Sequence, residues 1–224
     1  MSPDVPPTTV RSLHVLAEHV LGAGLYAVTG HIGLAVAPGG FGTPLGAIDQ
    51  LGGRWSVGHG VLVLEHPDGA RQEAPVTTVR AAAEFFGAAP GMPATVYEPA
   101  NPLDLDAPLA VDRAEADRIG AWLALGDEAL ARFAGDHAGD EPTAATLWPE
   151  HFDLGLSSRE VNYGVSPGDA DHAEPYLYVG PWTPRSGDFW NESFGASVAA
   201  SAIASVDDAV AFFEQGRARA AAEE

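Results

Sequence analysis

The sequence predicts an α+β fold in which antiparallel sheets pack against helices, arranged as two helix–strands–helix pseudo-repeats. Segments with apolar residues at helical spacing stand at the start, the middle and the end of the chain. Short segments in which apolar and polar residues alternate, separated by turn residues, lie between these helical segments. We expect one compact unit over residues 1–224, with pseudo-repeats at 9–98 and 109–220.

The first half begins with residues 10–28, whose apolar side chains stand near helical spacing and are interrupted by Gly22 and Gly24. The stretch HIGLAVAPGGFGTPLG indicates a short strand that ends in a Pro-Gly-Gly turn. The stretch RWSVGHGVLVLEHPDGARQEAPV indicates two strands joined at residues 67–69. A helix beginning near Val79 is predicted next, and ATVYEP is a candidate short strand.

The proline-containing stretch at residues 99–108 is the best candidate for a boundary between the halves. Asp112, with Glu115 three residues later, marks the capped start of a helix that runs to about residue 134. Four strand candidates follow, and Ser205 caps a last helix that ends near residue 220. These strand candidates are TLWPEHFDLGLSS, REVNYGVS, EPYLYVGPW and FGASVAASAIA.

One apolar pattern occurs in both halves. Residues 79–86 and 206–213 both read Val-x-x-Ala-x-x-Phe-Phe. Short apolar patterns also recur by chance, so an internal duplication and a coincidence both stay open. If the halves are duplicated, we expect a ligand site where they meet.

The charge of the chain limits its partners. The net charge is −20 at pH 7, and all 11 basic residues are arginines. A field this negative repels phosphate backbones and anionic lipids, so we expect neither nucleic acid nor a membrane as a partner. The absence of Lys excludes Schiff-base chemistry and the Walker phosphate loop. The absence of Cys and of a signal-like N-terminus favours a cytoplasmic location.

Residues 164–168, Gly-Val-Ser-Pro-Gly, match the Gly-x-Ser-x-Gly pattern of serine hydrolases. In that motif the residue after the serine donates its backbone N–H to the oxyanion, and Pro167 has no N–H to donate. The following residues also indicate a turn and a strand, whereas the motif requires a helix. We therefore interpret Pro167-Gly168 as the centre of a type II turn.

Histidine and carboxylate residues accompany two of the predicted strands. His151 and Asp153 stand two residues apart, and His172 and Glu174 repeat that spacing, so each pair would project from one face of a strand. Nitrogen and oxygen donors of this kind suit a divalent metal such as Zn or Mn. The same residue types also satisfy backbone groups at turns and strand ends, so both interpretations stay open.

Aromatic side chains concentrate between Trp148 and Phe194. Core packing is the default explanation for such a cluster. Beside Asp153 and Glu174, a wall of aromatic rings would instead form a small-molecule pocket with a few polar contacts. The residues expected in this wall are Tyr163, Tyr176, Tyr178, Trp182 and Trp190.

Four short patterns resemble those of actinobacterial hypothetical proteins related to a bacterial family of unknown function. They are Leu13-His14, Phe85-Phe86, Phe152-Asp153-Leu154, and Glu174-Pro175-Tyr176 with Tyr178. The resemblance extends in order from about residue 13 to residue 215. Such relatives usually have Ser or Gly at the position of His151 and no counterpart of His172, which implies that Asp153 and Glu174 are the shared polar pair. The resemblance implies no activity.

Three hypotheses about function follow. The leading one is a cytoplasmic protein that binds a small molecule in a cleft lined by the C-terminal aromatic residues, with Asp153 and Glu174 as polar contacts. The second is a metal-dependent, hydrolase-like enzyme that uses His151, Asp153, His172 and Glu174, with a metal-bound water as the nucleophile. The third is a non-catalytic protein-interaction module that uses the loop from Trp182 to Trp190.

Overall fold

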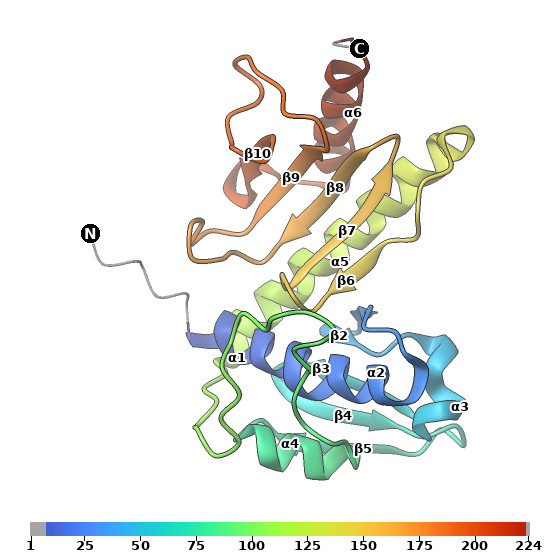
Figure 1. The fold of residues 1–224 in the computed structure, drawn as a ribbon, viewed down its shortest axis with the longest axis vertical. Coiled ribbons are helices and arrows are strands. Elements are labelled where there is room, and N and C mark those ends of the chain that lie inside the picture. Colours follow the sequence, from blue (N-terminus) through green and yellow to red (C-terminus); the bar gives the residue numbers. More distant parts are fainter. Residues whose placement is uncertain (1–7, 223–224) are drawn as a thin grey trace.

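The computed structural model describes residues 8–222 and has the predicted α+β class. Two five-stranded antiparallel sheets are each accompanied by helices, and each half of the chain supplies one sheet (Figure 1). In both halves a helix precedes the five strands and another helix follows them. An internal duplication remains a prediction.

The first half opens with a helix in three parts, α1 (Thr8–Leu16), a π-helical turn η1 (Ala17–Gly22) and α2 (Ala23–Thr29). The helix α4 (Val79–Phe86) closes the half. A short helical insertion, η2 (Leu45–Ala47) with α3 (Ile48–Leu51), separates the second strand from the third. The strands are β1 (Ala35–Ala37), β2 (Gly40–Gly42), β3 (Arg54–Gly58), β4 (Val61–Glu65) and β5 (Arg71–Pro75).

The second half opens with the long helix α5 (Arg113–Asp136) and the short turn η3 (Ala138–Asp140). After its strands come the turn η4 (Ala200–Ala202) and the helix α6 (Val206–Ala222). The strands are β6 (Thr146–Trp148), β7 (Asp153–Ser158), β8 (Val161–Ser166), β9 (Tyr176–Pro181) and β10 (Ala196–Ala199). Both sheets are simple meanders, because every strand pairs with its neighbours in sequence.

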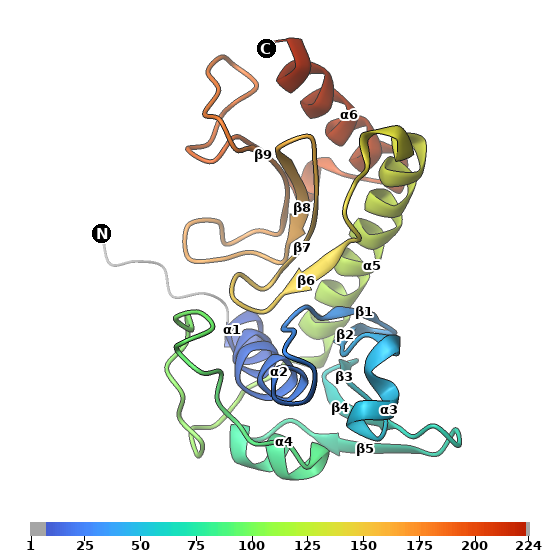
Figure 2. The ribbon, with the colours of Figure 1, turned by 45° about the vertical axis from the view of Figure 1, so that its right-hand side comes forward.

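The helix α5 connects the two halves. It runs along both sheets (Figures 1 and 2), and its side chains enter one hydrophobic core that includes residues of both halves. At Gly126 an added Cβ atom would overlap the side chain of Val165 on β8, so a glycine is needed for this close approach. An isolated antiparallel bridge between Leu34 and Leu147 joins the adjacent edges of the two sheets.

Several predicted elements are present in the structure. The Asp112 carboxylate accepts a hydrogen bond from the Glu115 N–H at 2.9 Å and caps α5, and the Ser205 hydroxyl caps α6 by accepting from the Asp208 N–H at 3.2 Å. The turn at Gly69, where φ is +86°, joins β4 to β5. These caps and turns depend only on residues near one another in sequence, which is why the sequence indicates them.

Two stretches that were each predicted as a single strand divide into two. His59, in the left-handed region with φ of +53°, turns the chain between β3 and β4. Phe152, with φ of +53°, ends the turn between β6 and β7. A non-glycine residue rarely adopts this conformation, so neither His59 nor Phe152 indicates its turn by residue type, although Gly60, with φ of +73°, shares the first turn.

Two further expectations about local structure were wrong. ATVYEP forms no strand and begins with a turn at residues 94–96, in which the Val96 N–H donates to the Pro93 carbonyl at 2.9 Å. Pro99, its last residue, has no N–H for a sheet hydrogen bond. Gly22 and Gly24 do not interrupt the first helix, which continues through the π-helical turn. None of the described helices is both long enough and apolar enough to span a bilayer.

Candidate functional site

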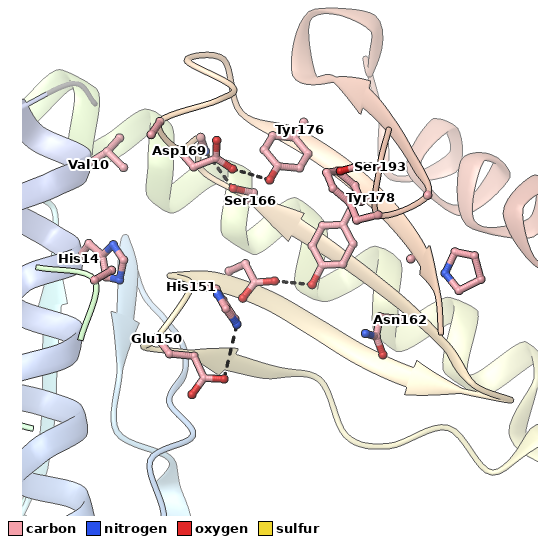
Figure 3. A pocket seen from close by; sticks show the side chains of 18 of the residues that line it. Val10, His14, Glu150, His151, Asn162, Ser166, Asp169, Tyr176, Tyr178 and Ser193 are labelled. Atoms are coloured by element: carbon pink, nitrogen blue, oxygen red, sulfur yellow. Dashed lines mark hydrogen bonds and ion pairs between the residues drawn. The ribbon is translucent and has the colours of Figure 1, made fainter. Parts of the chain in front are cut away.

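A pocket with a volume of about 880 Å³ lies between α1 and the second sheet. Helices α5 and α6 cover one face of this sheet, and the pocket lies on the opposite, open face (Figures 2 and 3). Val10 and His14 of α1 form one wall, and strands β7, β8 and β9 form the floor. The pocket therefore lies between the two halves of the chain.

Strand alternation decides which side chains reach the pocket. On β8, Val161, Tyr163 and Val165 point into the core, whereas Asn162 and Ser166 line the pocket. Tyr163 therefore does not line this pocket. It is 2% exposed, and its ring centroid lies 4.5 Å from that of Phe133 on α5.

Tyr178 forms the centre of the pocket floor. Gly164 is its direct partner on β8, and Gly155 on β7 is the partner of Gly164. A Cβ atom at Gly164 would overlap the ring of Tyr178, and one at Gly155 would lie 2.7 Å from its hydroxyl oxygen. The ring thus lies across the two neighbouring strands in the space that these glycines leave open.

The hydroxyl of Tyr178 donates a very short hydrogen bond to Oδ2 of Asp153 at the start of β7 (Figure 3). The other carboxylate oxygen, Oδ1, is buried and has no hydrogen-bond partner among residues 8–222. Burial raises the pKa of Asp153, and the hydrogen bond from Tyr178 opposes this effect only in part. Burial and the Asp153 charge also raise the pKa of Tyr178, which keeps its hydroxyl protonated as a donor.

Two further aromatic rings stand beside Tyr178. Phe194 contacts Tyr178 edge-on, with centroids 6.4 Å apart, and stacks at the same distance on Tyr176. The Tyr176 hydroxyl donates to Oδ2 of Asp169 at 2.6 Å, which fixes this ring at the wall. Trp182 is 62% exposed at the rim, where its indole N–H donates to Oδ1 of Asn162 at 3.1 Å.

His14 holds α1 against the second half. Its Nε2 donates to the Pro149 carbonyl at 2.8 Å, and its ring stacks on Phe152 with centroids 5.4 Å apart. Burial lowers the pKa of His14, although the nearby Glu18 carboxylate opposes this effect, so the ring is neutral at pH 7. The left-handed conformation of Phe152 brings this ring beneath His14 and starts β7 at Asp153.

The π-helical turn η1 fixes a further wall of the pocket. Its Glu18 is fully buried and accepts hydrogen bonds from the backbone N–H groups of Ala100 at 2.7 Å and Asn101 at 3.2 Å. The Asn101 side chain also donates to Glu18, and His19 contacts the Asn101 carbonyl oxygen at 2.7 Å. Ala100 and Asn101 line the pocket, so this buried pair positions a loop that has no regular structure.

The predicted polar pair is not brought together in one pocket. Asp153 lines the pocket floor, but Glu174 lies in the loop before β9, where its carboxylate is exposed and accepts from the Ser201 N–H at 2.7 Å. That hydrogen bond lowers the pKa of Glu174. Glu174 borders a second, apolar groove beside Trp122 of α5.

The four predicted metal ligands do not assemble either. His151 is in the turn before β7 and His172 in the loop before β9, so neither pair has the strand geometry that the spacing predicts. His172 lies 3.1 Å from a carboxylate oxygen of Glu192, and His151 lies 3.6 Å from Glu150. Within residues 8–222, no three His, Asp or Glu side chains gather in a way that could hold a metal ion.

Of the predicted aromatic wall, Tyr176, Tyr178 and Trp182 line the pocket, whereas Tyr163 and Trp190 do not. Trp190 is 8% exposed and packs edge-on against Phe189, with centroids 4.9 Å apart. The prediction did not include several lining residues from both halves of the chain. Among them are Arg11, His14, Asn101, Glu150, Asn162 and Phe194.

Comparison of the chain with protein-family models, curated protein sequences and solved structures finds no match. The resemblance to a bacterial family of unknown function therefore remains a prediction.

Proposed function

We propose that the protein binds a small organic molecule in the pocket between α1 and the second sheet. The volume of about 880 Å³ is within the usual range for ligand pockets. The pocket also has the usual composition of such sites, because aromatic rings and a few polar groups line it.

The observation that carries this proposal is the combination of Tyr178 and Asp153. Glycine inside a strand weakens a sheet, and the sheet has two of them beneath one tyrosine ring. A buried carboxylate oxygen without a hydrogen bond also destabilises the folded protein. Features that lower stability in this way are typical of binding positions, because a ligand can cover the Tyr178 ring and donate a hydrogen bond to Oδ1 of Asp153.

The proposal is tested by screening a library of metabolite-sized molecules for their effect on the melting temperature of the full chain. We expect hits that stabilise the wild-type protein and lose their effect in Tyr178→Ala, which removes the ring. Glu174→Gln is the matched control, because this exposed side chain lies outside the pocket. Calorimetric titration of each hit then gives the dissociation constant for all three proteins.

Two results would contradict the proposal. One is a library without any molecule that stabilises the wild-type chain. The other is a set of hits that stabilise Tyr178→Ala as strongly as the wild type, since their site would then lie elsewhere. Circular dichroism of Tyr178→Ala shows whether the variant is folded, and Tyr178→Phe provides a milder change that keeps the ring.

A further inference from the structure

We infer that the ligand is an organic cation, an ammonium group attached to an aromatic or apolar ring system, whose charge pairs with Asp153. This inference rests on the proposed function and adds the chemical class of the ligand. It is argued from the hydrogen bonds at Asp153, from the charges around it and from the neighbouring rings.

The first argument concerns hydrogen bonding. An ionised carboxylate only accepts hydrogen bonds, and Tyr178 supplies a donor to Oδ2 alone. The buried Oδ1 has no donor within residues 8–222. An ammonium group carries several donors together with a positive charge, and charge-assisted hydrogen bonds of this type are stronger than neutral ones. A ligand carboxylate would add a second acceptor and repel the first.

The second argument concerns the charges nearby. Glu150 lies close enough to raise the pKa of Asp153, so another acidic group stands at the same end of the pocket. His151, whose side chain is 73% exposed, lowers the pKa of Asp153 and does so more strongly than Glu150 raises it. The chain as a whole carries a charge of −20, which attracts cations to its surface.

The two arginines that line the pocket stand on other walls. Arg11 belongs to α1, and Arg185 belongs to the loop after β9. Arg185 also borders a separate, smaller cavity beside Arg159 and Arg217. A carboxylate ligand would have to be held by these arginines, and the experiment below includes anionic molecules for this reason.

The third argument concerns the rings. Tyr178, Tyr176 and Phe194 surround the region next to Asp153, with neighbouring centroids 6.4 Å apart. The faces of aromatic rings attract cations, and the attraction increases where water is excluded. A carboxylate beside several rings is a suitable environment for an ammonium group with an apolar substituent.

The test uses matched triplets in which one ring skeleton carries an ammonium, a hydroxyl or a carboxylate group. Tryptamine, tryptophol and indole-3-propionate form one triplet, and phenyl and naphthyl series form two others. Titration calorimetry with the full chain is expected to show that the ammonium member of at least one triplet binds at least about tenfold more tightly than its alcohol. The carboxylate member is expected to bind most weakly.

Asp153→Asn keeps an acceptor for Tyr178 and removes the charge. We expect this variant to weaken binding of the ammonium member by about tenfold or more and to leave the alcohol within about twofold. Glu174→Gln is again the control and should bind like the wild type. At mildly acidic pH, binding of the ammonium member to the wild type should release protons, because a nearby cation favours ionised Asp153 over its protonated form.

The outcomes separate this inference from the proposed function. If the alcohols or carboxylates bind and the ammonium members do not, the ligand is not a cation but the pocket still binds small molecules. If Asp153→Asn binds all ligands like the wild type, the charge of Asp153 does not pair with the ligand and the inference is wrong, while the pocket still binds small molecules. If no triplet member and no molecule of the wider library binds, both the inference and the proposed function are wrong.

Discussion

At the scale of single residues, we expect Asp153 to lower the stability of the folded protein and to strengthen the proposed ligand binding. Its side chain is held in an environment that favours the protonated form, because burial raises the pKa of the carboxyl group. A carboxyl with a raised pKa binds its proton more tightly in the folded state than in the unfolded state. The folded protein therefore loses stability as the pH rises from the unfolded pKa, near 3.8, through the higher folded pKa.

This direction of the pH dependence predicts how the stability of Asp153→Asn differs from that of the wild type. The amide cannot ionise, so we expect its stability relative to the wild type to increase from about pH 4 to pH 7. Urea unfolding followed by circular dichroism at several pH values measures this difference. Glu174→Gln should show the opposite trend, because its folded pKa is lowered and the wild-type carboxylate stabilises the fold above the unfolded pKa. A difference between Asp153→Asn and wild type that stays constant with pH would contradict the prediction.

Gly164 is the second residue for which the structure gives a clear expectation. Its Cβ atom would overlap the ring of Tyr178, so Gly164→Ala should destabilise the fold by about 1–3 kcal/mol through overpacking. In a double-mutant cycle with Tyr178→Ala the cost of Gly164→Ala should decrease, because the overlapping ring is gone. Gly46→Ala is the control, since its Cβ would meet nothing within 4 Å. Equal costs with and without the ring would contradict the placement of Tyr178.

The sequence could indicate some of these residues but not their grouping. Asp153, Tyr176, Tyr178 and Trp182 were predicted because acidic and aromatic residues are frequent in pockets. Glu174 was predicted by the same reasoning, yet it faces a different groove. The face of a strand on which a side chain lies depends on the residue at which the strand begins. Phe152 adopts a left-handed conformation that the sequence does not indicate, and this conformation sets the start of β7.

At the scale of elements, the π-helical turn η1 fixes one wall of the pocket. It contains the buried Glu18 and His19, which hold the loop at Ala100 and Asn101 against α1. Interruptions of this kind are frequent at functional sites. The sequence gives no sign of it, because the extra residue in the turn leaves the apolar spacing of the helix nearly unchanged.

Glu18→Ala should therefore release the loop at Ala100 and Asn101. Removal of the carboxylate leaves two backbone N–H groups and the Asn101 amide without their acceptor, and we expect a loss of at least about 2 kcal/mol in stability. Amide hydrogen exchange at Ala100 and Asn101 should become faster. Glu84→Ala, an exposed position on α4, is the control and should change stability by less than about 0.5 kcal/mol. Unchanged exchange at both amides would contradict this role of Glu18.

Sequence patterns predicted elements well where the determining residues are neighbours. The capped starts of α5 and α6 and the turn at Gly69 belong to this group. The strand divisions at His59 and Phe152 were missed, because both turns need a left-handed non-glycine residue. Contacts with distant residues hold both in place, because Phe152 is buried against His14 and the exposed His59 contacts the Asp117 carboxylate at 2.7 Å. No local preference predicts these contacts.

At the scale of the whole molecule, the two halves share one hydrophobic core, and α5 packs on both sheets. A shared core makes the unfolding of one half unfavourable without the other, so we expect a single cooperative transition for residues 8–222. The pocket depends on the same arrangement, because one wall comes from the first half and the floor from the second. We therefore expect cooperative unfolding and the proposed ligand binding to depend on the same packing of the two halves.

A core substitution in one half tests this coupling. Leu62 on β4 is 1% exposed, and Leu62→Ala should cost about 2–5 kcal/mol. If the halves unfold together, hydrogen exchange measured by mass spectrometry in increasing urea should show the same lowered midpoint for peptides from β4 and from β8. Leu156→Ala on β7, 3% exposed, is the reciprocal variant and should lower both midpoints as well. If each substitution lowers the midpoint of its own half alone, the halves are independent, and α1 would not be held against the second sheet firmly enough to form a fixed wall of the pocket.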